Sequence, residues 1–142
     1  MSHDSTKVLM GATTSNVYEA SNKKGATVIE AGLVVRLKSD DTPSIAKADG
    51  SLLGVSLGRD LSDTGRTAIA RKGLGIPVKL ASGFTPVIGA AVAVSDTTGE
   101  AKAYTGTGDG YVNAVYKSAV LTGIGEDGLD KRVALIDFPG GL

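Results

Sequence analysis

The sequence predicts an all-β protein, either a small β-barrel or β-tulip or a sandwich. Three observations support this class. Glycine accounts for 20 of the 142 residues, about twice the usual share of ~7 %, which indicates many tight turns. Aromatic residues make up only 4 % of the chain, so we expect a core of valine, isoleucine, leucine and alanine. Short β-branched runs recur roughly every ten residues, as in sandwiches and barrels.

The first part of the chain differs in composition from the rest. We expect residues 1–26 to form an extended N-terminal arm and residues 27–142 to form a single β domain. Polar and turn-forming residues dominate the first segment, and such a segment cannot bury enough apolar surface to fold alone. It is either a disordered tail or an arm that becomes ordered on another subunit or partner. In the second case its apolar anchors are the partner-binding residues Val8, Leu9, Met10, Val17 and Tyr18.

After the arm, β-branched runs alternate with Gly, Asp, Ser and Thr. Asp49-Gly50 is a strong hairpin signal, because glycine accepts the positive φ of a type I′ turn. Pro77 has no N–H to donate, so its strand should be an edge strand or carry a bulge. A short helix is the alternative around residues 56–66. The expected strands lie near residues 27–30, 33–38, 44–47, 52–57, 67–71, 76–80, 90–94, 101–104, 114–121 and 132–138.

Within these runs, apolar residues alternate with polar or small neighbours, as expected for strands with one buried face. The alternation predicts which side chains lie inside. The expected core residues are Val34, Val55, Ile69, Val78, Val92, Val94, Val120, Val133 and Leu135.

The residues needed for catalysis are scarce. The chain has no cysteine, which removes thiolate nucleophiles and cysteine-ligated metals. Its one histidine, His3, lies in the expected arm, where a Ser–His–Asp triad could not hold it rigidly. We therefore expect a protein that is not an enzyme, with no catalytic, cofactor-binding or metal-binding residues and no cofactor.

Three groups of carboxylates lie in turn-like sequence, where Asp commonly forms Asx turns. A glycosidase pair would need a sugar cleft, commonly walled with aromatic residues, in which this chain is poor. Calcium at the third group is the alternative, although its spacing does not match an EF-hand loop. The groups are Asp40-Asp41, Asp60 with Asp63, and Glu126-Asp127 with Asp130.

The charge balance argues against nucleic acid as a partner. Fifteen Lys and Arg residues offset fifteen Asp and Glu residues, whereas nucleic-acid binders usually carry a basic excess or stripe. No apolar run approaches the ~20 residues that span a bilayer, and the N-terminus lacks the apolar core of a signal peptide. We expect neither nucleic acid nor membrane as a partner.

One stretch of sequence is similar to a known family. Leu53-Gly54-Val55-Ser56-Leu57 is followed by residues 65–73 and then by Ile76-Pro77-Val78-Lys79-Leu80, and the pattern continues through residues 89–96 and 99–103. It resembles the capsid decoration or cement proteins of tailed phages and the small β-barrel families related to the lambda-type head decoration protein. The resemblance covers about residues 28–104 and a closing strand at residues 132–138.

The resemblance implies a structural virion protein that binds the outer surface of an icosahedral phage capsid and stabilises it. Its partners would be the major capsid protein and further copies of itself, with a trimer favoured. It would be made in the host cytoplasm and lie on the capsid exterior. The family carries no catalytic residues, and its extended N-terminal arm often joins the sheet of a neighbouring capsid subunit, a role that falls here to residues 1–26.

A second function belongs to a different class. The chain could be a ligand- or carbohydrate-binding β module of a virion fibre or adhesin. Such a module needs exposed aromatic side chains, and the candidates are Tyr104, Tyr111 and Tyr116. A small hydrolase is the third hypothesis and has the least support.

Overall fold

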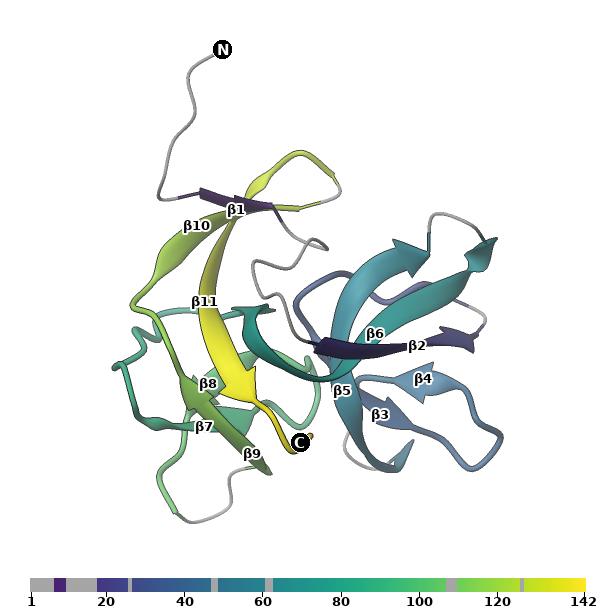
Figure 1. Ribbon diagram of the computed structural model, residues 1–142, viewed down its shortest axis with the longest axis horizontal. Helices are drawn as coiled ribbons and strands as arrows, with labels where there is room; N and C mark the ends of the chain where they lie inside the picture. The colour runs from purple at the N-terminus through teal and green to yellow at the C-terminus, as the bar shows by residue number, and fades with distance from the viewer. Residues whose placement is uncertain are drawn as a thin grey trace.

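The computed structural model describes residues 7–9, 18–25, 27–46, 49–60, 63–106, 110–125 and 127–142. In these residues the regular elements are strands, apart from a 3₁₀ turn at Asp49. The strands belong to one sheet (Figure 1). The predicted all-β class is confirmed.

The strands range in length from two residues to seventeen. Their bounds are β1 Lys7–Leu9, β2 Tyr18–Lys24, β3 Val34–Leu37, β4 Pro43–Ser44, β5 Ser51–Asp60, β6 Asp63–Lys79, β7 Ala91–Val94, β8 Ala101–Ala103, β9 Gly110–Tyr116, β10 Leu121–Ile124 and β11 Asp130–Phe138.

The longest strand, β6, is shared by two groups of strands. Its first part pairs with β5 and with β2, and its second part pairs with β11. Gly73 marks the change, because it pairs with Tyr18 of β2 and with Phe138 of β11. Figure 1 shows β2 to β5 on one side of the view and β7 to β11 on the other, with β6 running between them.

The main path of the described sheet runs β4-β3-β5-β6-β11-β9-β7-β8, while β10 lies beside β11 and β1 beside β10. All of these pairings are antiparallel except β1 with β10. The path ends at β4 and β8, so strand pairing leaves the sheet open instead of closing it into a barrel.

Single backbone hydrogen bonds nevertheless bring distant parts of the sheet together. Val34 N–H of β3 donates to Gly99 O in the turn before β8, at 2.8 Å, and Ala81 N–H after β6 donates to Ala101 O of β8 at the same distance. At Gly99, φ is +73° and an added Cβ would lie 2.9 Å from Val34 O, so this contact requires glycine. The curled sheet therefore surrounds its core.

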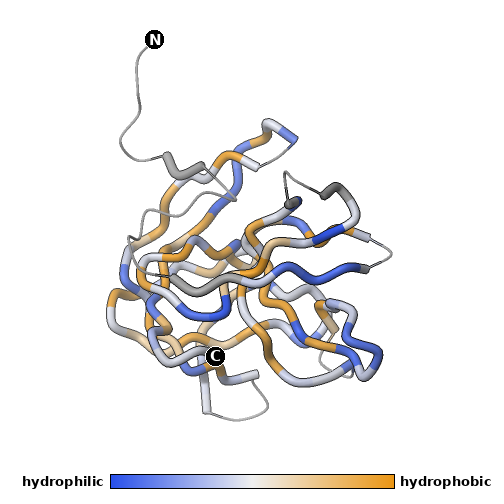
Figure 2. The backbone as a smooth tube through the Cα atoms, turned by 45° about the vertical axis from the view of Figure 1, so that its right-hand side comes forward, coloured by the Kyte–Doolittle hydropathy of each residue, from blue (hydrophilic) through white to orange (hydrophobic). Residues whose placement is uncertain are grey.

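The core draws on both groups of strands. One cluster of buried residues joins Val34 and Val55 from the first group to Val92, Tyr116 and others from the second. Figure 2 shows hydrophobic stretches of chain toward the middle of the molecule and hydrophilic stretches at outlying turns. The two groups of strands therefore share one interior.

Most of the predicted core residues are buried. Leu135 is only partly buried, and it packs against a small second cluster that contains Val133. The prediction for Val120 is wrong: its side chain is 39 % exposed, because β9 ends at Tyr116 and Val120 lies in the connection to β10. The confirmed members are Val34, Val55, Ile69, Val78, Val92, Val94 and Val133.

Several predicted elements differ from the structure. Residues 27–30 are not a strand, and the runs 67–71 and 76–80 belong almost entirely to the single strand β6. The alternative of a helix around residues 56–66 is wrong, because β5 extends to Asp60 and pairs antiparallel with β6. The β5–β6 pairing is a hairpin of consecutive strands. The continuity of β6 through residues 67–79 instead goes with its pairing to β11, which is distant in the chain and which local sequence does not reveal.

The sheet begins earlier in the chain than the predicted boundary at residue 27. β2 pairs along β6 from Tyr18 to Lys24, and Lys23 Nζ lies 3.2 Å from both carboxylate oxygens of Asp41. Residues 18–24 therefore belong to the sheet of their own chain. Whether the residues before Tyr18 act as an arm on a partner stays a prediction.

A deletion series tests this boundary. Removing residues 2–24 takes away a seven-residue strand, whereas removing residues 2–17 spares it. We expect the longer deletion to lower the melting temperature by at least about 5 °C relative to the shorter one, because a loss of 1 kcal/mol corresponds to roughly 2–8 °C in domains of about this size. Differential scanning calorimetry measures the difference. Equal melting temperatures would show that β2 adds nothing to stability.

Core truncation tests the register of β11. Ile136 is fully buried in the main cluster, so Ile136→Ala should lower the free energy of unfolding by about 2–5 kcal/mol. Val120→Ala is the matched control, and its half-exposed side chain should change that free energy by no more than about 0.5 kcal/mol. Urea denaturation gives both values, and similar losses for the two variants would contradict the assigned faces.

Candidate binding surface

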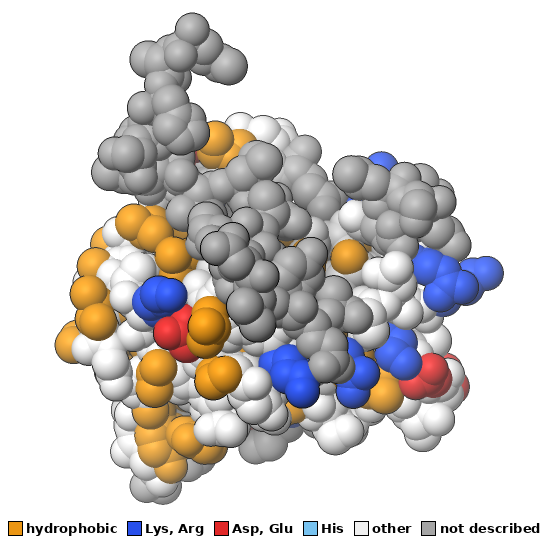
Figure 3. Space-filling view, viewed as in Figure 1, with side chains coloured by type: hydrophobic (Ala, Val, Ile, Leu, Met, Phe, Trp, Pro, Cys, Tyr) orange, Lys and Arg blue, Asp and Glu red, His pale blue; other side chains and the backbone are white. Residues whose placement is uncertain are grey.

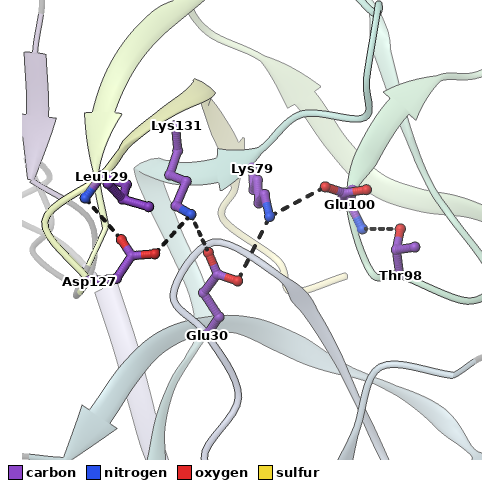
Figure 4. Close-up of polar contacts among 7 residues, drawn as sticks. All are labelled: Glu30, Lys79, Thr98, Glu100, Asp127, Leu129 and Lys131. Atoms are coloured by element: carbon purple, nitrogen blue, oxygen red, sulfur yellow. Dashed lines mark hydrogen bonds and ion pairs between the residues drawn. The ribbon is translucent and has the colours of Figure 1, made fainter.

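Two lysines and three carboxylates form a chain of ion pairs (Figure 4). Lys79 Nζ lies 3.8 Å from Glu30 Oε2 and 3.6 Å from Glu100 Oε2. Lys131 Nζ lies 3.8 Å from Glu30 Oε1 and 3.2 Å from Asp127 Oδ2. Each exposed pair of this kind contributes little to stability, because solvent screens the charges. These ion pairs link β6 and β11 to the loops that precede β3 and β8, so they help to hold the curled sheet together.

Two of the carboxylates predicted to serve turns, Asp40 and Asp127, do so. Asp40 Oδ1 accepts hydrogen bonds from Thr42 Oγ1 at 2.6 Å and from Thr42 N–H at 3.2 Å. Asp127 Oδ1 accepts one from Leu129 N–H at 3.0 Å. These bonds stabilise the charged form and hold the pKa of each carboxyl below its usual value.

The calcium alternative at Glu126, Asp127 and Asp130 stays a hypothesis, because one of its three ligands lies outside the described residues. In the described ranges no group of three or more His, Cys, Asp or Glu residues could hold a metal ion. Glu126 lies outside the described residues, as do the side chains of Asp60 and Asp63 and the whole of His3.

A bulge interrupts β6 opposite β11. Between the pairs Ile76–Ile136 and Gly73–Phe138, β6 has two residues, Leu74 and Gly75, where β11 has only Asp137. Gly75 has a φ of +67°, which glycine adopts without strain. The prediction that the strand of Pro77 is an edge strand or carries a bulge is thus confirmed by the bulge.

The Asp137 side chain holds this bulge in place. Its Oδ1 accepts a hydrogen bond from Gly75 N–H at 2.7 Å, and the same oxygen lies 3.8 Å from Lys117 Nζ. Leu74, the other bulged residue, is 36 % exposed. Bulges often lie next to functional sites, where they redirect side chains.

A second irregularity lies in β9. Val112 pairs with Val92 and Val115 pairs with Ala91, so Asn113 and Ala114 have no partner residue on β7. The side chain of Asn113 is exposed and that of Ala114 is buried. Residues from both irregularities line one groove.

This groove, called the bulge groove below, has a volume of about 400 Å³. That volume lies within the roughly 300–1,000 Å³ of typical small-molecule sites. Its exposed apolar lining includes Tyr111, which is 51 % exposed, and Val115, which is 44 % exposed. The lining residues are Leu74, Ala91, Tyr111, Asn113, Ala114, Val115, Asp137, Pro139 and Gly140.

Two of the three tyrosines considered for ligand binding meet beside the groove. The rings of Tyr104 and Tyr111 lie 5.0 Å apart at 60°, and both are about half exposed. The third, Tyr116, is a core residue: its hydroxyl donates to Lys102 O at 2.8 Å, and burial raises its pKa. Only Tyr104 and Tyr111 remain as surface candidates.

A separate feature is a projecting turn at residues 87–90, called the apolar turn below. The side chains of Val87 and Ile88 are 69 % and 65 % exposed. Ala90 N–H donates to Val87 O, and Gly89 N–H donates to Tyr116 O at 2.7 Å, so the turn is tied to β9. Figure 3 shows hydrophobic side chains gathered along the side of the molecule that carries β9 and β10.

A larger groove of about 550 Å³ lies between residues 27–33 and the β3–β4 hairpin. Its lining contains no aromatic side chain, and Asp40 on its rim is already hydrogen-bonded to Thr42. Nearby in β3, Arg36 is buried with its Nε lacking a hydrogen-bond partner, and burial lowers its pKa, against the opposing effect of the Asp96 charge. We assign these features to packing.

The predicted partner-binding residues fall mostly outside what the structure describes. Val8 and Leu9 lie in β1, which pairs with Gly123 and Ile124 of β10, and Tyr18 begins β2. Their side chains are outside the described residues, as are Met10 and Val17 altogether. The partner-binding role of this set stays a prediction.

Sequence reasoning missed the bulge groove and the apolar turn. Gly89 carried a signal for the apolar turn, since glycine adopts positive φ without strain and its φ here is +86°. The bulge groove had no comparable signal, because its residues come from strands far apart in the chain.

Comparisons with known proteins give no relative: no protein family, no curated protein and no solved structure matches this chain. Among the residues that the structure describes, no helix is long and apolar enough to cross a membrane.

The Asp127 turn gives a test by titration. The hydrogen bond from Leu129 N–H is the largest cause of its lowered pKa, and Lys131 adds to it. In carbon-detected NMR the carboxyl should titrate below its ordinary value of about 3.9. Lys131→Gln should raise this pKa only part of the way, because the Leu129 bond remains.

The same shift fixes the direction of the pH effect on stability. Because the pKa of Asp127 is lower in the folded state than in the unfolded state, its ionised carboxylate stabilises the fold at pH values above the ordinary, unfolded-state pKa. This stabilisation is lost as the pH falls through the lowered, folded-state pKa. A Lys131→Gln variant whose Asp127 pKa equals that of the unchanged protein would rule out the ion pair.

Proposed function

We propose that this protein is a structural virion protein that binds the outer surface of an icosahedral phage capsid and stabilises it. The observation that carries the proposal is the apolar turn, where Val87 and Ile88 project from the β body. Such a rigid apolar projection suits a protein partner, because burying each side chain contributes about 1.5–3 kcal/mol. The sequence resemblance to phage decoration proteins is the reason for proposing a phage capsid as this partner.

The backbone of the apolar turn supports this use. Its hydrogen bonds to Tyr116 O and within the turn hold the backbone that carries the two side chains in place before binding. Preorganised contacts lose less conformational entropy on association than flexible ones. A shell that presents many identical sites adds to weak single contacts by multivalency.

The proposal includes self-association. A homo-oligomer, with a trimer favoured, would present several apolar turns to the shell at once, as symmetry repeats one surface on each copy. The major capsid protein is the proposed partner, the capsid exterior is the proposed location, and no enzymatic activity is proposed. The predicted anchors Val8, Leu9, Met10, Val17 and Tyr18 would add contacts from the N-terminal segment.

A second candidate function is a ligand- or carbohydrate-binding β module of a virion fibre or adhesin. The specific observation in its favour is the exposed Tyr104–Tyr111 pair beside the bulge groove. The two functions use different surfaces, so they can be tested separately.

Substitution of the apolar turn tests the first function. Ile88→Asp should weaken binding to capsids of the phage of origin by about tenfold or more, because it places a charge where an apolar contact is proposed. Leu129→Asp is the matched control, since Leu129 is 62 % exposed and lies outside the turn. Co-sedimentation of the full chain with capsids, at several concentrations, gives the affinities.

The outcomes separate clearly. Loss of binding in Ile88→Asp but not in Leu129→Asp, with unchanged melting temperatures, supports the apolar turn as the contact. If Ile88→Asp binds capsids as tightly as Leu129→Asp and the unchanged protein, the apolar turn is not part of the interface. Failure of the unchanged protein to sediment with capsids contradicts the decoration function itself.

A further inference from the structure

The bulge groove brings together three chemical groups from distant parts of the chain. Tyr111 contributes a half-exposed ring, Asn113 an exposed amide, and Asp137 a carboxylate. They come from β9 and β11, and Leu74 of the β6 bulge completes the apolar lining. We propose that this groove binds a saccharide, with the Tyr111 ring against one sugar face and Asn113 and Asp137 toward its hydroxyls.

The chemistry of the lining favours this ligand class. A pyranose ring has an apolar face of C–H groups and a rim of hydroxyls, each of which donates and accepts hydrogen bonds. A tyrosine ring offers a broad apolar surface at low cost in side-chain entropy. An amide both donates and accepts, and a carboxylate accepts, so Asn113 and Asp137 complement hydroxyl groups.

The groove is less suited to an extended peptide. Peptides commonly bind a sheet by adding a strand to a free edge. At Val115, in the lining of the groove, β9 is already paired on both sides, with Ala91 of β7 and with Asp137 of β11. A ligand there must be recognised mainly through side chains.

Two of the side chains proposed to recognise the saccharide are held in position by their neighbours. The 2.7 Å hydrogen bond from Gly75 N–H orients the Asp137 carboxylate, and the neighbouring ring of Tyr104 restrains Tyr111. A ligand that meets groups already in position loses less affinity to ordering. The inference rests on the second candidate function and does not depend on the decoration function.

The experiment uses the full chain and an array of oligosaccharides that contain neutral hexoses, N-acetylhexosamines, deoxyhexoses and uronic acids. The strongest binder is then titrated into isotope-labelled protein and followed by NMR. We expect shifts confined to the backbone amides of residues 74–75, 111–115, 137–138 and 140 and to the side-chain amide of Asn113.

Variants assign the contacts. Tyr111→Ala and Asn113→Ala should each weaken binding by about tenfold, since each removes one recognition element. Tyr111→Phe keeps the ring and should stay within about threefold of the unchanged protein, and Leu129→Ala, outside the groove, should bind normally. The NMR spectrum of each variant without ligand shows whether its fold is intact.

Each result decides the inference. Groove-confined shifts that weaken in Tyr111→Ala and Asn113→Ala support it. No binding to any saccharide in the array overturns it, and if the protein still sediments with capsids, the decoration function stands. Saccharide binding that maps elsewhere, or that neither alanine variant weakens, overturns the site while leaving the carbohydrate-binding function.

Discussion

The structure depends on the continuity of β6 from Asp63 to Lys79. A single strand of this length carries β2 and β5 along its first part and β11 along its second. Two groups of strands therefore share one backbone. The bulge at Leu74 and Gly75 shifts the register between them, so the alternation of side chains between faces is set separately on each side of the bulge.

The bulge at Leu74 and Gly75 lies near the point where β6 changes partners. An extra residue bends a strand and increases its twist, which suits a strand that serves two differently directed groups. Asp137 fixes the bend by accepting the Gly75 N–H. Away from the bulge, the hydrogen bond from Val34 N–H to Gly99 O and the ion pairs of Glu30 with Lys79 and Lys131 also hold the curled sheet together.

The candidate surfaces follow from this arrangement. Where β6 and β9 depart from regular pairing, the sheet leaves a groove with an aromatic ring, an amide and a carboxylate at its wall. The apolar turn is separate, since it is held on β9 by backbone hydrogen bonds and directs two apolar side chains outward. The proposed decoration and saccharide-binding functions therefore use different surfaces of one β body.

The sequence by itself determined the all-β class, most strands, the burial of residues such as Val55 and Val92, and that the strand of Pro77 is either an edge strand or carries a bulge. These depend on alternation and turn chemistry, which are local. Only the tertiary structure decided that two predicted strands are one, that residues 18–24 join the sheet, that Tyr116 is buried while Tyr111 is exposed, and that Asn113 and Asp137 share a groove. Strand pairing joins residues far apart in the chain, and the local pattern of the sequence does not specify which strands will pair.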